Sequence, residues 1–108
     1  MLISKKTIGR KIMENGREYS GLFIIDPEKE EGIEEVKGKI SEVISSHSGD
    51  IVKENVMGKR KLAYPIKKKT FAIYYEINFN AAPEGISKMM RQFRINTDIL
   101  RTLIDRTN

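Results

Sequence analysis

The chain has 108 residues, a length that fits one compact domain, since domains usually run from about 50 to 250 residues. Hydrophobic residues make up 39% of it and charged residues 32%, as in soluble globular proteins, and no apolar run approaches the roughly 18 residues of a membrane span. Because there is no cysteine and only one histidine, His47, the composition excludes a disulfide scaffold, a thiol nucleophile and a cysteine-ligated or histidine-cluster metal site.

The net charge of +5 is unevenly distributed along the chain. Residues 1–17 carry +4, residues 18–50 carry −6, residues 51–82 carry +5 and residues 83–108 carry +2. Such segregation predicts one surface that binds polyanions and another that avoids them. Solubilising surface charge is the alternative, and the charge pattern alone does not separate the two.

The chain begins with a basic segment that lacks sustained periodicity. We interpret residues 1–16 as a flexible basic N-terminal arm, or as an upstream start that adds nothing to the fold, and assign residues 17–108 to the domain. The first predicted strand covers residues 19–25. Asp26 and Pro27 then start a predicted helix over residues 27–47, as N-cap and first helical residue, and Gly49 is expected to close it. Its apolar face has helical spacing: Ile33, Val36, Ile40, Val43 and Ile44.

Residues 50–66 and 69–79 are typical of an antiparallel hairpin with a short turn at Lys67 and Lys68, and Gly58 indicates a bulge or bend. One face of the second strand is a stripe of large apolar residues: Phe71, Ile73, Tyr75, Ile77 and Phe79. We expect this stripe to face the helices, which leaves the opposite face, with Tyr74, more open.

A second helix is predicted from Pro83 to near Asn96, and a last strand over residues 99–106. The predicted order is strand, helix, strand, strand, helix, strand. This order predicts an α+β fold, the ferredoxin-like βαββαβ sandwich, in which a four-stranded antiparallel sheet is backed by two helices.

Catalytic chemistry finds no support in the sequence. The adjacent acidic residues Glu34 and Glu35 lie on a solvated helix face, and the lone His47 supports no Ser/His/Asp set. Glycine-rich motifs that cradle nucleotide phosphates are also missing. We therefore predict a protein that is not an enzyme and has no cofactor, no metal and no small-molecule substrate.

The predicted hairpin carries the strongest candidate site, six cations and one tyrosine: Lys59, Arg60, Lys61, Tyr64, Lys67, Lys68 and Lys69. Alternation sends Lys59 and Lys61 to one side of the strand and Arg60 to the other. Such an extension can lay cations along a phosphate backbone. The alternative is that the lysines protect an edge strand from aggregation. Further cations could extend the footprint: Lys88, Arg91, Arg94, Arg101 and Arg106.

RNA readers with this topology stack bases on outward aromatic residues of the sheet. Here the third strand has only Tyr74 on its outward face and lacks the glycine of their pattern, so base stacking on the sheet face is disfavoured. We expect backbone and shape recognition by the hairpin, with a protein partner covering the open face.

The segment GKRKLAYPIK at residues 58–67 resembles the most characteristic segment of the bacterial small-subunit ribosomal protein S-six family. The stretches REY and FIIDP near the first strand, and FRIN and DILR near the last, are similar to it as well. The resemblance covers about residues 17–107. It implies a non-catalytic cytoplasmic protein of the ribosome that binds the central domain of small-subunit ribosomal RNA as a heterodimer with ribosomal protein S-eighteen, with no membrane partner. By that resemblance, RNA or the partner lies near Arg60, Lys61, Tyr64, Lys67 and Arg101.

Two other functions remain open. A ferredoxin-like enzyme of the acylphosphatase kind would need a glycine-rich phosphate loop after the first strand, where Asp26, Pro27 and Glu28 stand instead. A regulatory or oligomerising ferredoxin-like module without RNA binding would need a ligand cleft, which the sequence does not display, and a stable homo-oligomer would favour it.

Overall fold

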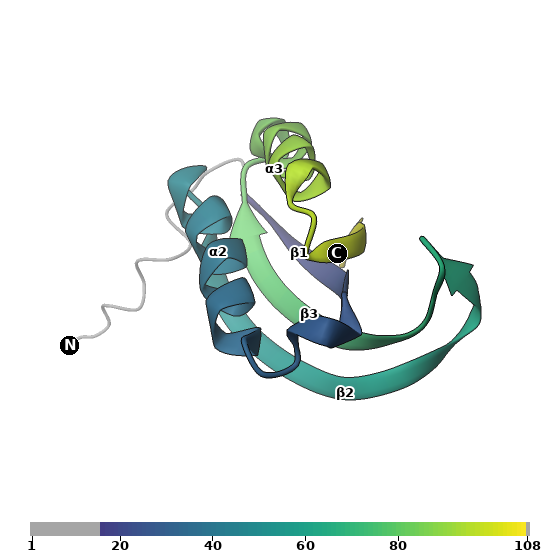
Figure 1. The fold of residues 1–108 in the computed structure, drawn as a ribbon. Coiled ribbons are helices and arrows are strands. Elements are labelled where there is room, and N and C mark those ends of the chain that lie inside the picture. The colour runs from purple at the N-terminus through teal and green to yellow at the C-terminus, as the bar shows by residue number, and fades with distance from the viewer. Residues whose placement is uncertain (1–15, 108) are drawn as a thin grey trace.

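Four antiparallel strands form one sheet in the order β2-β3-β1-β4, and both helices lie on one of its faces (Figure 1). A computed structural model describes residues 16–107. Its elements are β1 (Arg17–Ile25), the 3₁₀ turn η2 (Pro27–Lys29), α2 (Ile33–Ser46), β2 (Asp50–Ile66), β3 (Lys69–Ala81), α3 (Pro83–Ile95) and β4 (Ile99–Arg106). The predicted ferredoxin-like sandwich is confirmed. The basic arm predicted for residues 1–16 lies, apart from Gly16, outside the described residues.

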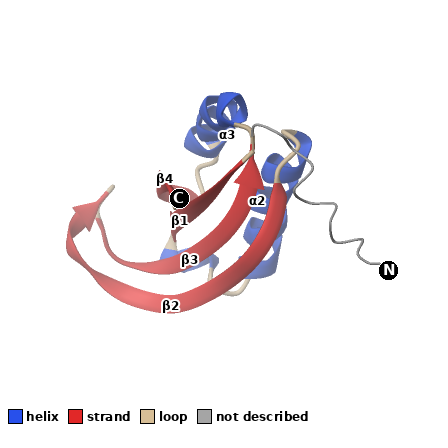
Figure 2. Ribbon diagram, turned by 180° about the vertical axis from the view of Figure 1, so that it is seen from behind, coloured by secondary structure: helices blue, strands red, loops and turns tan. Residues whose placement is uncertain are grey.

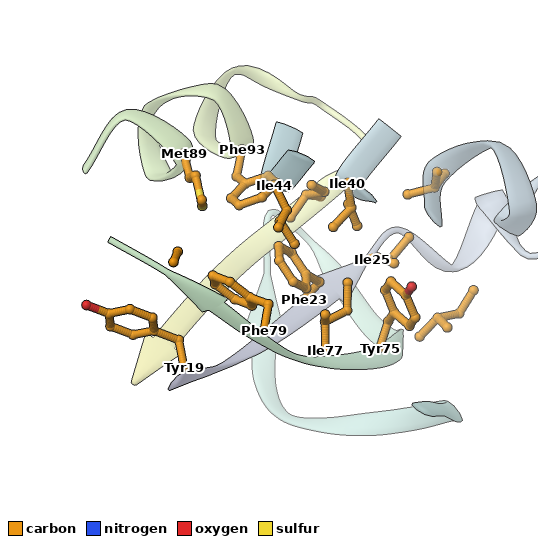
Figure 3. Close-up of a cluster of buried hydrophobic side chains, with 14 residues drawn as sticks. Tyr19, Phe23, Ile25, Ile40, Ile44, Tyr75, Ile77, Phe79, Met89 and Phe93 are labelled. Atoms are coloured by element: carbon orange, nitrogen blue, oxygen red, sulfur yellow. The ribbon is translucent and has the colours of Figure 1, made fainter. Parts of the chain in front are cut away.

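The main hydrophobic core fills the space between the sheet and the two helices (Figure 3). Phe23 of β1 is fully buried, and its ring meets that of Phe93 of α3 edge to face, with 4.8 Å between the ring centroids. The ring of Tyr75 lies 6.2 Å from Phe23 on the neighbouring strand β3. Ile40 of α2 and Met89 of α3, also fully buried, close the core from the helical side.

The first helix starts later than the sequence predicts. Asp26 does act as a cap, because its carboxylate accepts a hydrogen bond of 3.0 Å from the Glu28 N–H, but it caps the 3₁₀ turn η2. Tight backbone bonds continue as far as Gly32, whose N–H donates to the Lys29 carbonyl, and α2 begins only at Ile33. Glycine is a poor helix former, so the chain breaks between the two segments there. The prediction of one helix over residues 27–47 is therefore wrong in its first six residues.

The end of α2 has the hydrogen bonds of a Schellman motif. The Gly49 N–H donates to the Ile44 carbonyl at 2.8 Å, and the Ser48 N–H donates to the Ser45 carbonyl at 3.0 Å. The residue in the left-handed conformation is Ser48, with φ at 64°, one position before the Gly49 that was expected to close the helix. Gly49 is required for space instead: a Cβ there would lie 2.5 Å from Cγ2 and 2.8 Å from the carbonyl oxygen of Ile44.

This crowding predicts opposite effects for two glycine-to-alanine changes. Gly49→Ala should lower the free energy of unfolding by about 1–3 kcal/mol, as overpacking of a tight site does. Gly38→Ala should raise it by about 0.5–1 kcal/mol, because Gly38 lies inside α2 and a methyl group added there would meet nothing within 4 Å. Urea denaturation of both variants measures the two values, and a stabilising Gly49→Ala would contradict the close approach to Ile44.

Strands β2 and β3 form a long curved hairpin that reaches beyond the helices (Figure 2). Its turn consists of Lys67 and Lys68, whose φ angles of 49° and 69° match the primed turns that fit hairpin twist. Gly58 has a φ of 92° and lies at a register shift, so the predicted bulge is confirmed. Bulges bend the strand that carries them, which accounts for the curvature.

The apolar stripe of β3 is buried only where helices cover it. Ile73, Tyr75, Ile77 and Phe79 are at most 3% exposed, whereas Phe71 is 45% exposed. The prediction that the stripe faces the helices is therefore wrong for Phe71, because the hairpin carries this residue past them. On the opposite face of the sheet, a second and smaller buried cluster forms around Ile24, Leu62, Ala72 and Leu100, with Tyr74 packed against it.

Candidate nucleic-acid interface

The outer half of the β2–β3 hairpin, residues 59–71, presents cations on both of its faces; we call this segment the outer hairpin. Lys59 pairs in register with Ile73 and Lys61 with Phe71, on the side of the sheet that faces the helices. Arg60 pairs with Ala72 and therefore points to the open side. The alternation predicted for these three residues is confirmed, and all three are exposed.

The segment around the turn is also exposed. Tyr64 is 63% exposed, in the part of β2 between the register positions Lys61 and Ile66 where pairing with β3 is interrupted. This exposure favours a contact role over a packing role for Tyr64. Lys67 and Lys68 form the tip of the hairpin and are exposed as well.

Lys69 differs from the other hairpin lysines because it is engaged within the protein. Its Nζ lies 2.8 Å from Glu28 Oε2 and 3.6 Å from Asp26 Oδ1. The hydrogen bond to Glu28, together with the charge of Asp26, raises the pKa of Lys69 above its ordinary value. Lys59 makes a longer contact of the same kind, 3.8 Å from Glu30 Oε1. These contacts link the outer hairpin to η2 and to the residues on either side of it, Asp26 and Glu30.

Curvature of the hairpin brings its tip toward the end of α3. Lys67, Arg94 of α3 and Arg101 of β4 line one hollow of ≈ 280 Å³, whose other lining residues include Met90 and Leu100. Sequence reasoning placed Lys67 and Arg101 in the candidate site and Arg94 only among possible extensions. The hairpin tip thus meets the end of α3 and the start of β4, which lie far from it in sequence, at a basic hollow with apolar lining.

The face of the sheet opposite the helices, which we call the open face, carries a strip of apolar side chains. Leu22 of β1 and Leu103 of β4 are direct cross-strand partners on this face, and Leu103 is 46% exposed. Arg101 pairs with Ile24 on the same face, two residues further along each strand. Such a strip, rimmed by charge, is typical of a protein contact rather than of a nucleic-acid contact.

A buried phenol on the helix side has a structural role. The Tyr75 hydroxyl donates a 2.7 Å hydrogen bond to Glu54 Oε1, and Lys37 Nζ lies 5.6 Å from the centre of the Tyr75 ring. Burial, followed by the hydrogen bond to Glu54, raises the pKa of Tyr75. The group therefore stays protonated at neutral pH and ties β3 to the edge strand β2.

Residues 16–107 contain neither a metal-binding cluster nor a membrane-spanning helix. The described residues hold no cluster of three or more His, Asp or Glu side chains that could bind a metal ion. Within the same range, no helix is both long and apolar enough to cross a membrane.

Comparison with known proteins relates the sequence of this chain to one family. Residues 18–106 match the family model described as "Ribosomal protein S6". The small ribosomal subunit protein bS6 of Pseudarthrobacter chlorophenolicus is 44% identical over 91 residues, covering 83% of this chain and 90% of the relative. The bS6 of Caldanaerobacter subterraneus subsp. tengcongensis is 39% identical, covering 85% of this chain and 98% of the relative.

Solved structures agree with the sequence matches. The crystal structure of 30S ribosomal protein S6 from Thermotoga maritima superposes with a TM-score of 0.80 at 31% identity, covering 85% of this chain and 88% of that chain. The relatives are structural proteins of the small ribosomal subunit, so the predictions of a non-enzymatic protein and of a place on the cytoplasmic ribosome are confirmed. The chain belongs to the ribosomal protein S6 family.

Proposed function

We propose that this protein binds the central domain of small-subunit ribosomal RNA, together with ribosomal protein S-eighteen as heterodimer partner, during assembly of the subunit. One observation carries the RNA-binding part. The outer hairpin extends past the helices and presents Lys59, Arg60, Lys61 and the turn lysines to solvent. A projecting element with cations on both faces suits a groove between phosphate backbones.

In this proposal, the RNA and the partner protein bind to two different surfaces. The hairpin and the basic hollow with Lys67, Arg94 and Arg101 supply the cations for RNA. The partner docks on the open face of the sheet, where Leu22 and Leu103 provide apolar contact. Arg101 lies on this face beside the basic hollow, so a docked partner and the bound RNA meet there.

A backbone-only RNA contact is weakly selective at physiological salt. Specificity in this proposal comes from the pair of proteins, whose combined surface recognises the RNA. The test is a salt-titrated binding assay with a central-domain RNA fragment, with and without the S-eighteen protein of the same organism. We expect tight, selective and salt-sensitive binding only when the partner is present. Binding no better than to random duplex RNA in both cases would refute the proposal and favour an oligomerising ferredoxin-like module.

The partner surface can be tested separately with Leu103→Glu. A buried charge at the contact should weaken binding of the partner by at least about tenfold, since unpaired charges are costly to bury at an interface. Partner-free RNA binding should change little. Ile95→Glu is the matched control, because Ile95 is 70% exposed at the end of α3 on the helix side of the molecule. Equal effects of the two variants on partner binding, measured by calorimetry, would contradict docking on the open face.

A further inference from the structure

Phe71 is an exposed aromatic ring set among lysines. It lies directly opposite Lys61 in the hairpin register, on the face that continues the helix-covered side of the sheet. It borders a hollow of ≈ 340 Å³ between the hairpin and η2, and Lys59, Lys68 and Lys69 line the same hollow. We call this feature the Phe71 hollow.

We propose that the Phe71 hollow binds one unpaired nucleotide of the RNA, with its base stacked on Phe71 and its phosphates beside Lys59 and Lys68. This inference rests on the proposed RNA-binding function and names the kind of nucleotide that one part of the surface recognises. It adds a base contact to a surface otherwise suited to backbone recognition.

Charge complementarity selects this occupant. Three lysines and one carboxylate, Glu28, line the hollow, and Asp26 and Glu30 at its edge lie against Lys69 and Lys59. Lys68 at the exposed tip and Lys59, whose contact with Glu30 is long, still provide positive charge that favours an anionic group over an apolar protein segment. An aromatic platform beside cations is the arrangement by which proteins hold single-stranded nucleic acid, because any base offers a flat face to stack while the cations track its backbone. A paired base keeps both faces inside its helix, so the occupant must be unpaired.

The walls of the hollow are held in place before RNA arrives. Lys69 is fixed by its ion pairs with Glu28 at 2.8 Å and Asp26 at 3.6 Å, which tie the hairpin to η2 on the far side of the hollow. Lys59 has only a 3.8 Å contact with the exposed Glu30, which a phosphate can replace at low cost. Lys69 is therefore a positioning residue here, while Lys59 and Lys68 face the ligand.

The sequence pattern concealed this feature. Phe71 continues the alternation of Ile73 and Tyr75, so it counts as a core residue until the length of the helices is known. The expectation that base stacking is disfavoured concerned Tyr74 and the open face. The Phe71 hollow lies on the other face, beyond the helices.

The experiment compares wild type with Phe71→Leu and Phe71→Tyr, using the full chain with its S-eighteen partner. The probe is a central-domain RNA fragment with 2-aminopurine at its unpaired positions in turn, since this base changes its fluorescence when it stacks. We expect Phe71→Leu to weaken binding about tenfold and to remove the fluorescence change at one position, in line with the loss of one base stack. The salt dependence should stay the same, because no charge is lost. Phe71→Tyr should restore both the affinity and the signal.

Other results separate this inference from the proposed function. If wild type binds the fragment selectively and Phe71→Leu binds equally well, the Phe71 hollow takes no base and the inference alone fails. The inference alone also fails if Phe71→Leu weakens binding to a fully paired duplex as much as binding to the fragment. If wild type itself fails to prefer the fragment over random duplex, both proposals fail. Thermal unfolding of each variant checks that the fold is retained, as expected for a side chain that is 45% exposed.

Discussion

Changing Lys59, Arg60 and Lys61 together to glutamate is expected to weaken binding to the central-domain RNA by a hundredfold or more, as a rough estimate from the loss of three phosphate contacts and the gain of three repulsive charges. The slope of log affinity against log salt should fall by about 2 to 3, since each lost contact removes about 0.7 to 0.9. Filter binding or fluorescence anisotropy between about 50 and about 300 mM salt measures both quantities.

The fold should survive this triple change. All three side chains are exposed, and the only ion pair among them that the structure identifies, Lys59 with Glu30 at 3.8 Å, is of the weak surface kind. A charge-matched control changes Lys29, Lys39 and Lys53 to glutamate, which are exposed cations outside both the candidate site and its possible extensions. An equal loss of affinity in the control would show that net charge, rather than the hairpin, governs binding. A large drop in thermal stability would instead assign the hairpin cations a structural role.

Local patterns were sufficient to predict most of the fold. The hairpin followed from two alternating segments separated by two residues, and the structure has β2 ending at Ile66 and β3 starting at Lys69, as predicted. The last strand, Ile99–Arg106, was also predicted with its observed bounds. These features depend on backbone alternation and turn geometry, which are properties of neighbouring residues.

Features that depend on contacts between distant residues could not be predicted in this way. The ion pair of Lys69 with Glu28 joins residues 41 positions apart, and it sets Lys69 apart from the lysines beside it. The convergence of Lys67, Arg94 and Arg101 depends on how strongly the hairpin curves. The hairpin curves because its pairing shifts at several positions along β2. Of these shifts, only the one at Gly58 could be predicted from the sequence.

The late start of α2 has the same kind of cause. Asp26 and Pro27 form a good helix start, and the sequence offered no reason to stop after one turn except Gly32. The structure uses that single turn to aim carboxylates at the hairpin, since Glu28 reaches Lys69 and Glu30 reaches Lys59. In a continuous helix each residue is rotated by about 100° from the one before it. Glu28 and Glu30 would then point in nearly opposite directions and could not both contact the hairpin.

Phe23→Ala is expected to cause a larger loss of stability than any other substitution proposed for this protein. Phe23 is fully buried and contacts Phe93 and Tyr75, so the variant loses the transfer energy of the ring and leaves a cavity between sheet and helices. Such changes cost about 3–5 kcal/mol, a large share of the roughly 5–15 kcal/mol that holds a domain together. The thermal midpoint should fall by at least about 12 °C.

Phe71→Ala is the matched control, because it removes the same side chain from the same sheet at a position that is 45% exposed. We expect it to cost less than about 1 kcal/mol, since no buried cavity forms. Equal losses for the two variants in urea denaturation would contradict the placement of Phe23 at the centre of the core. The two variants also separate effects on stability from effects on RNA binding. Phe23→Ala lowers RNA binding only because part of the protein is unfolded, so a stabilising osmolyte restores binding. The binding defect expected on truncating Phe71 persists in fully folded protein.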